Sequence, residues 1–101
     1  MTDNSENRES FIHQLEEIIN QRKNESPESS YTASLMSRGL DKILQKVGEE
    51  SVEFILDAKN NNPERIISEG ADLMYHFLVS LCACNLSIHD IENELRRRHE
   101  T

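Results

Sequence analysis

Two apolar segments of this 101-residue sequence each carry a closely spaced set of carboxylates. The stretch KVGEESVEF contains Glu49, Glu50 and Glu53, and the stretch SEGADLMYHF contains Glu69 and Asp72. On a helix, these spacings place the members of each set within one turn, about 5–6 Å apart at Cβ. Few basic residues lie among them, and a buried carboxylate without a partner is strongly destabilising. Hard divalent cations relieve such repulsion, and magnesium bridges protein carboxylates to substrate phosphates. The spacing therefore indicates a magnesium site, and a phosphate-bearing ligand is one that such an ion could hold.

A polar stripe along the second segment supports this interpretation. Apolar residues surround nearly the whole circumference of a helix drawn over 63–84, and a helix that is apolar all round is buried. The residues that remain polar are Glu69, Asp72, His76 and Ser80. A lone polar stripe on a buried helix must face a cavity, a metal or a partner. The simpler alternative is a solvated acidic face, which is what we expect of Glu16 and Glu17 near the N-terminus.

Helical spacing of apolar residues predicts the elements that would position these side chains. The expected helices cover about 7–23, a short segment that ends at Gly39, 41–60, 63–84 and a last helix that follows Ser87 and runs into RRRH. The expected capping residues are Asn62 with Pro63, Asn85 in a left-handed conformation, and Ser87 with Asp90. The sequence has no strand alternation, internal repeat or glycine-rich phosphate loop. We predict an all-α bundle of about four to five helices, completed by homo-oligomerisation because two helices have excess apolar surface.

Length and charge limit the classes of function. The chain is long enough for one domain, which we expect over 10–101 after a flexible tail at 1–9. The net charge of −8 argues against binding nucleic acid or an anionic membrane. Cys82 and Cys84 suggest reduced thiols, and the polar N-terminus does not resemble a signal peptide. No apolar run approaches the ~20 residues that span a bilayer, so we expect a cytoplasmic protein.

Four further segments give the sequence a family resemblance. The carboxylate pattern resembles the metal-binding signature of the all-α nucleotide pyrophosphohydrolases, the MazG-like superfamily. The segments SYTASL (30–35), KVGEE (46–50), DLMYH (72–76) and ELRRRH (94–99) together resemble the phosphoribosyl-ATP pyrophosphatases of histidine biosynthesis. Each motif alone is weak, whereas their order and spacing, over about 11–100, are specific.

The resemblance implies an activity, a cofactor and an assembly. The expected reaction cleaves 1-(5-phosphoribosyl)-ATP between its α and β phosphates, and releases pyrophosphate and 1-(5-phosphoribosyl)-AMP in the second step of histidine biosynthesis. The implied cofactor is Mg²⁺, and the implied assembly is a homodimer or a larger homo-oligomer. Many relatives are fused to a cyclohydrolase, and we expect this chain to be the stand-alone form.

The resemblance also implies roles for the five carboxylates. All of them are expected to bind magnesium or to lie beside a ligand, and Glu50, Glu53 and Asp72 are favoured as direct ligands. The expected catalytic residues are Glu49, Glu50 and Glu69. Either Glu49 or Glu69 would be the base that activates the attacking water.

The expected substrate-binding residues have weaker support. They are Ser30, Tyr31, Thr32, Lys42, Lys46, His76, Arg97 and Arg98. The first three could equally form a helix cap, and the lysines could lie on the surface or pair with Glu50. His76 could hydrogen-bond a ligand carboxylate or be a satisfied buried histidine. The arginines, with Arg96, could reach the phosphates from a partner subunit or form a solvated helix end.

Three other functions compete with this one. A house-cleaning pyrophosphohydrolase of the same superfamily would use the same carboxylates on ordinary nucleotides. A di-iron carboxylate bundle needs Glu-x-x-His pairs, and none of the four histidines has a glutamate three residues before it. A non-catalytic oligomerising module would need the apolar surface but not the carboxylates.

Overall fold

The computed structural model of the protein describes residues 10–100. The tail predicted at 1–9, and Thr101, lie outside the described residues. The described chain contains five α-helices, one short 3₁₀ helix and no strand, which confirms the all-α prediction. The helices are α1 (Phe11–Arg22), η2 (Pro27–Ser29), α2 (Tyr31–Arg38), α3 (Leu40–Lys59), α4 (Pro63–Ala83) and α5 (Ile88–His99).

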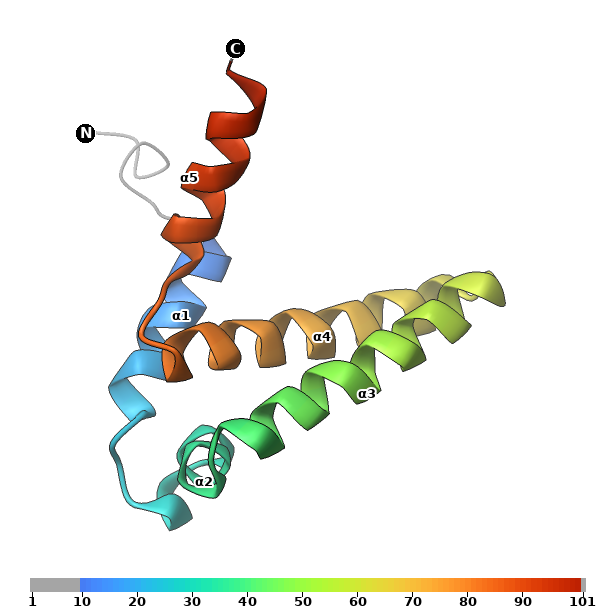
Figure 1. The fold of residues 1–101 in the computed structure, drawn as a ribbon. Helices are drawn as coiled ribbons and strands as arrows, with labels where there is room; N and C mark the ends of the chain where they lie inside the picture. Colours follow the sequence, from blue (N-terminus) through green and yellow to red (C-terminus); the bar gives the residue numbers. More distant parts are fainter. Residues whose placement is uncertain (1–9, 101) are drawn as a thin grey trace, which may run out of the picture.

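The two longest helices, α3 and α4, form an antiparallel hairpin that extends from the rest of the molecule (Figure 1). Asn61 has a positive φ of 59° in the turn between them. The Asn62 side chain then caps α4 by accepting a hydrogen bond from the Arg65 backbone N–H at 3.3 Å, and Pro63 occupies the first turn. The caps predicted here are confirmed.

The hydrophobic core lies where the C-terminal half of α4 meets α1, α2 and the start of α3. Its fully buried side chains are Ile19, Leu35, Ile43, Leu78, Val79 and Cys82. Because this core is at one end of the hairpin, the other end of α3 and α4 is covered by little more than the two helices themselves (Figure 1).

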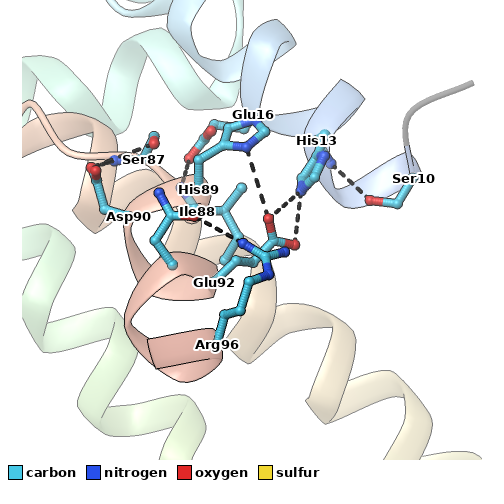
Figure 2. Close-up of polar contacts among 10 residues, drawn as sticks. Ser10, His13, Glu16, Ser87, Ile88, His89, Asp90, Glu92 and Arg96 are labelled. Atoms are coloured by element: carbon cyan, nitrogen blue, oxygen red, sulfur yellow. Dashed lines mark hydrogen bonds and ion pairs between the residues drawn. The ribbon is translucent and has the colours of Figure 1, made fainter. Parts of the chain in front are cut away.

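The last helix is attached to α1 by a buried polar contact. Asn85 adopts a φ of 61° after α4, as predicted. The Ser87 backbone N–H donates to the Asp90 carboxylate at 2.9 Å, which is one half of the predicted capping box. The Ile88 N–H donates to Glu16 Oε2 at 2.7 Å (Figure 2). Glu16 is therefore buried, and the prediction of a solvated face is wrong for it, whereas Glu17 is exposed as predicted.

Helix α4 corrects the expectation about membrane-spanning length. By length and composition its 21 residues could cross a membrane, and α4 is the one helix among the described residues that meets this criterion. A core helix passes the same test, and α4 supplies most of the core. It also carries Glu69, Asp72 and His76, so this one helix is weak evidence for a membrane span.

The two cysteines should differ sharply in reactivity. Burial, more than the nearby Glu16 carboxylate, raises the pKa of the Cys82 thiol to about 11, whereas Cys84 is exposed. Because the thiolate is the nucleophile, we expect iodoacetamide at pH 8 to label the native chain once, at Cys84. Mass spectrometry should find two labels after denaturation, and Cys84→Ser should leave the native chain unlabelled. Equal labelling rates of the two thiols in the native protein would contradict this prediction.

Candidate active site

Three of the five predicted carboxylates meet where α3 and α4 lie side by side. Glu50 comes from α3, and Glu69 and Asp72 come from α4. One oxygen from each lies within 4.8 Å of the others. Glu69 is 9% exposed, Glu50 is half-buried, and Asp72 is exposed. A helix turn separates Glu69 from Asp72, so the packing of α4 on α3 is what adds Glu50 to the pair. We call these three residues the carboxylate cluster.

The charges of this cluster are only partly balanced. Desolvation raises the pKa of Glu69 above its ordinary value, and the negative charges of Glu53, Asp72 and Asp57 raise it further. Arg65 opposes this shift, with its Nη2 atom 3.6 Å from Glu69 Oε2. Repulsion between these carboxylates therefore destabilises the folded protein, and Arg65 offsets only part of this effect.

Asp57 belongs beside this cluster, although it was absent from the predicted ligands. It lies one turn after Glu53 on α3, and its Oδ1 atom is 3.6 Å from Arg65 Nε. Its other oxygen is buried and has no hydrogen-bond partner within the described residues. Helical spacing puts Asp57 on the same side of α3 as Glu50 and Glu53, and this spacing was the signal that could have identified it.

The donor set fits a hard divalent cation. It consists of the carboxylate oxygens of Glu50, Glu69 and Asp72, held close together by two packed helices, and the buried Asp57 oxygen without a partner belongs to a neighbouring carboxylate outside this set. Magnesium and calcium prefer such oxygen ligands, whereas zinc prefers nitrogen and sulfur. The residues that could hold the ion are Glu50, Glu69 and Asp72, with Glu53 and Asp57 next to them.

Glu49 lies outside the carboxylate cluster. It is exposed and accepts a hydrogen bond from Gln45 Nε2 at 2.9 Å. That bond, more than the nearby charges of Lys46 and Lys42, lowers the pKa of Glu49. Lys46 Nζ lies 3.8 Å from Glu49 Oε1, whereas the sequence had suggested Glu50 as its partner. A carboxylate with a lowered pKa is a weak base, so this environment does not favour Glu49 as the base.

His76 connects the carboxylate cluster to the start of α2. Its Nδ1 atom lies 2.7 Å from Glu50 Oε1 and 3.0 Å from the Asp72 carbonyl oxygen. Both of these oxygens accept, so Nδ1 must carry a proton and donate. The other nitrogen, Nε2, lies 3.0 Å from the Tyr31 hydroxyl, which can donate to it. His76 is therefore both a satisfied buried histidine and a partner of a cluster carboxylate.

The other residues of the SYTASL segment have structural partners. The Ser30 side chain caps α2 by accepting from the Ala33 N–H at 3.0 Å, which confirms the capping alternative for this residue. The buried Thr32 hydroxyl is hydrogen-bonded to the Tyr75 hydroxyl. Tyr31 is half exposed, so of these three residues it is the one that offers both a contact with His76 and an open surface.

The structure places the basic end of α5 away from the carboxylate cluster of the same chain. Helix α5 points away from the α3–α4 hairpin (Figure 1). Arg97 contacts Glu94 at 2.5 Å and Arg98 contacts the same carboxylate at 3.0 Å. Both side chains are exposed at the end of the helix, as expected if they form a solvated helix end. A role on the phosphates would require a second subunit.

Comparison with known proteins places nearly the whole described chain in one sequence family. The model of the family described as "Phosphoribosyl-ATP pyrophosphohydrolase" matches residues 12–99. A histidine biosynthesis bifunctional protein HisIE of Vibrio cholerae is 51% identical over 90 residues, which are 89% of this chain and 43% of that protein. The corresponding HisIE of Bacteroides thetaiotaomicron is 46% identical over 90% of this chain and 45% of its own length. A phosphoribosyl-ATP pyrophosphatase of Geobacter sulfurreducens is 48% identical over 93% of this chain and 87% of that protein. The chain thus spans less than half the length of the bifunctional relatives.

Proposed function

The chain belongs to the phosphoribosyl-ATP pyrophosphohydrolase family, and from this premise we propose that it hydrolyses 1-(5-phosphoribosyl)-ATP to 1-(5-phosphoribosyl)-AMP and pyrophosphate. The observation that supports this most is the carboxylate cluster, in which Glu50, Glu69 and Asp72 offer oxygens within 4.8 Å of one another. The names of the bifunctional relatives refer to histidine biosynthesis, and we assign the reaction to that pathway as part of the proposal. A cytoplasmic location is part of the same proposal.

We assign Mg²⁺ to this cluster, with Glu50, Glu69 and Asp72 as the residues that hold it. When bound there, the ion would neutralise phosphate oxygens and help to orient the attacking water. Glu53 and Asp57 extend the negative surface along α3. The Arg65 guanidinium lies beside Glu69 and Asp57 and keeps this end of the cluster from being uniformly negative.

Glu69 is the better candidate for the base, through the carboxylate oxygen that is not bound to the ion. Its pKa is raised by desolvation and by neighbouring negative charges, whereas that of Glu49 is lowered by Gln45. A carboxylate whose pKa is raised accepts a proton from water more readily. In the proposed step the water oxygen forms a bond to phosphorus, its proton passes to Glu69, and the bond to the pyrophosphate leaving group breaks.

His76 is proposed to position Glu50. Its Nδ1–H donates to Glu50 while Tyr31 holds the opposite nitrogen, so the imidazole fixes one ligand carboxylate. Groups that orient a metal ligand typically contribute 10–100-fold in affinity. We expect His76→Asn to raise the magnesium concentration for half-maximal activity by about 10–100-fold, and Tyr31→Phe to raise it less.

A magnesium titration of pyrophosphate release would check this prediction. The matched control is His99→Asn, because His99 is exposed at the end of α5. An unchanged magnesium requirement with a lower kcat would place His76 on the substrate and not on the ligand.

The exposed apolar surface of the hairpin supports a homo-oligomer. Of the large exposed side chains, helical spacing puts Leu40, Leu44 and Ile55 on one side of α3 and Ile67 and Met74 on one side of α4. Beside them lies a cavity of about 480 Å³, lined by residues that include Val47, Phe54 and Phe77. Two helices cannot bury such a surface between themselves, and contiguous exposed apolar patches mark interaction sites. We propose that a second copy of the chain covers this side, which we call the apolar face of the hairpin.

The test of the proposed activity is a pyrophosphate-release assay with phosphoribosyl-ATP, ATP and dUTP. We expect release from phosphoribosyl-ATP that needs magnesium and stops with EDTA. Release from ordinary nucleotides instead would assign the chain to the house-cleaning pyrophosphohydrolases. No release from any substrate by a folded oligomer would favour a non-catalytic module.

A further inference from the structure

A second group of metal-ligating side chains lies between α1 and α5, outside the carboxylate cluster (Figure 2). His13 comes from the first turn of α1, where its backbone N–H donates to the Ser10 side chain. His89 and Glu92 come from α5 and are three residues apart, so they share one side of that helix. Glu92 points between the two imidazoles (Figure 2).

The three side chains are close enough to share one ion. His13 Nε2 lies 3.0 and 2.9 Å from the two Glu92 oxygens, and His89 Nδ1 lies 3.8 Å from Glu92 Oε1. The two imidazole rings are 4.3 Å apart between centroids. One ligand atom from each residue lies within 4.8 Å of the others.

We propose that His13, His89 and Glu92 bind a divalent transition-metal ion of the class that prefers imidazole nitrogen and carboxylate oxygen, such as Zn²⁺. With bonds of about 2.1 Å, the ligand atoms of a tetrahedral zinc ion are roughly 3.4 Å apart. The contacts of 2.9 and 3.8 Å lie on either side of this value. To bind the ion, the His89 side chain would have to move closer to Glu92. This side chain is 56% exposed and has room to rotate. Three protein ligands leave one position for water.

The cluster contains more than a simple ion pair requires. A polar contact between α1 and α5 needs one imidazole and Glu92, and the second imidazole is not required for it. A metal ion uses both rings in their neutral form. Arg96 follows Glu92 by one turn, but it contacts Asn93 at 3.0 Å and Glu100 at 3.7 Å. Within residues 10–100, the Glu92 carboxylate therefore contacts the two histidines.

Metal binding here would fix the orientation of α5. The start of this helix is held to α1 by the Glu16–Ile88 hydrogen bond and by the buried Ile88 side chain. Beyond this, α5 extends away from the core (Figure 1). An ion held by His13 and Glu92 would strengthen the attachment that their contact already provides one turn further along α5, before the basic residues at its end.

The proposal is tested by zinc titration of the full chain after EDTA treatment, without a histidine tag. We expect one Zn²⁺ per chain at this site by calorimetry and a rise in Tm. Both His89→Ala and Glu92→Gln should weaken binding at least tenfold, and Glu92→Gln preserves size and a hydrogen bond to His13. His99→Ala is the matched control and should bind zinc as the native chain does.

Imidazole NMR signals locate the ion. Zinc should shift the signals of His13 and His89 and leave those of His99 unchanged. Zinc affinity in His89→Ala and Glu92→Gln that equals the affinity of the native chain would overturn the proposal, as would a shift confined to His76, which lies beside the carboxylate cluster. None of the three ligands belongs to that cluster, so the result is independent of the proposed hydrolysis.

Discussion

Replacing Glu69 with glutamine should abolish magnesium-dependent pyrophosphate release and, at the same time, raise the Tm of the metal-free protein. The loss of activity follows because the substitution removes a ligand and the proposed base. Groups that only orient a metal ligand contribute about 10–100-fold to metal affinity or activity, so we expect the loss of a ligand and base to lower activity by more than about 100-fold. The gain in stability follows because glutamine keeps the size of the side chain and removes a charge that Glu53, Asp72 and Asp57 repel.

The stability effect has a defined pH dependence. Desolvation first, and neighbouring carboxylates second, raise the pKa of Glu69 in the folded protein above its ordinary value of 4.5. The folded state therefore binds this proton more tightly than the unfolded state, and this residue lowers stability as pH rises. The advantage of Glu69→Gln should be full above the folded pKa and should vanish below pH 4.5. Thermal unfolding of both proteins at pH 4 and pH 7.5, in EDTA, measures it.

Two controls separate charge repulsion from a general effect of substitution. Glu17→Gln removes an exposed carboxylate from α1 and should change neither activity nor Tm appreciably. Magnesium should raise the Tm of the native chain more than that of Glu69→Gln, since a ligand that binds the folded state stabilises it. A Glu69→Gln protein that is less stable than the native chain at pH 7.5 would show that Arg65 outweighs the repulsion.

Local sequence signals predicted most of the fold. The ends of α4 and the start of α5 are determined by residues within four positions, such as Asn62 for Arg65 and Ser87 for Asp90. Such caps are readable from sequence because both partners lie in one short segment. The same holds for Glu69 and Asp72, which one helical turn brings together before any packing is considered.

Contacts between distant segments account for what the sequence did not predict. Glu16 was expected on a solvated face because its partner, the Ile88 N–H, lies 72 residues away. His13 and Glu92 are 79 residues apart, so no spacing rule connects them. The orphan oxygen of Asp57 depends on how α4 packs against α3. In each case the missing information was the pairing of helices, which periodicity does not specify.

The apolar face of the hairpin leads to the second large effect, on assembly. Ile67 is 72% exposed in the single chain, and Ile55 is also exposed. Burying an isoleucine side chain contributes roughly 1.5–3 kcal/mol. In a symmetric dimer each substitution acts twice, and a charge introduced into the interface adds a desolvation cost.

We therefore expect Ile67→Glu to weaken self-association by at least about 100-fold, since every 1.4 kcal/mol is a tenfold change. Analytical ultracentrifugation over a concentration series should find the native chain as a dimer or larger, and Ile67→Glu as a monomer. The matched control is Phe11→Glu, which introduces the same charge at a similarly exposed position on α1, outside the hairpin. A native chain that is monomeric at every concentration, or a Phe11→Glu protein that dissociates as readily as Ile67→Glu, would contradict the assignment of this face.

Activity of the monomeric variant then links the assembly to the chemistry. Ile67 lies on α4 between Arg65 and Glu69 in sequence, yet it points to the exposed apolar side while Glu69 is buried against α3. Loss of pyrophosphate release in the Ile67→Glu monomer, with an intact helical CD spectrum, would mean that one hairpin cannot hold its carboxylates in place alone or that a partner supplies basic side chains. Arg97→Ala and Arg98→Ala in the dimer distinguish these causes, because they should lower activity only if the partner's helix end reaches the phosphates. Full activity in the monomer would instead show that the carboxylate cluster of one hairpin is sufficient, and that the apolar face contributes stability alone.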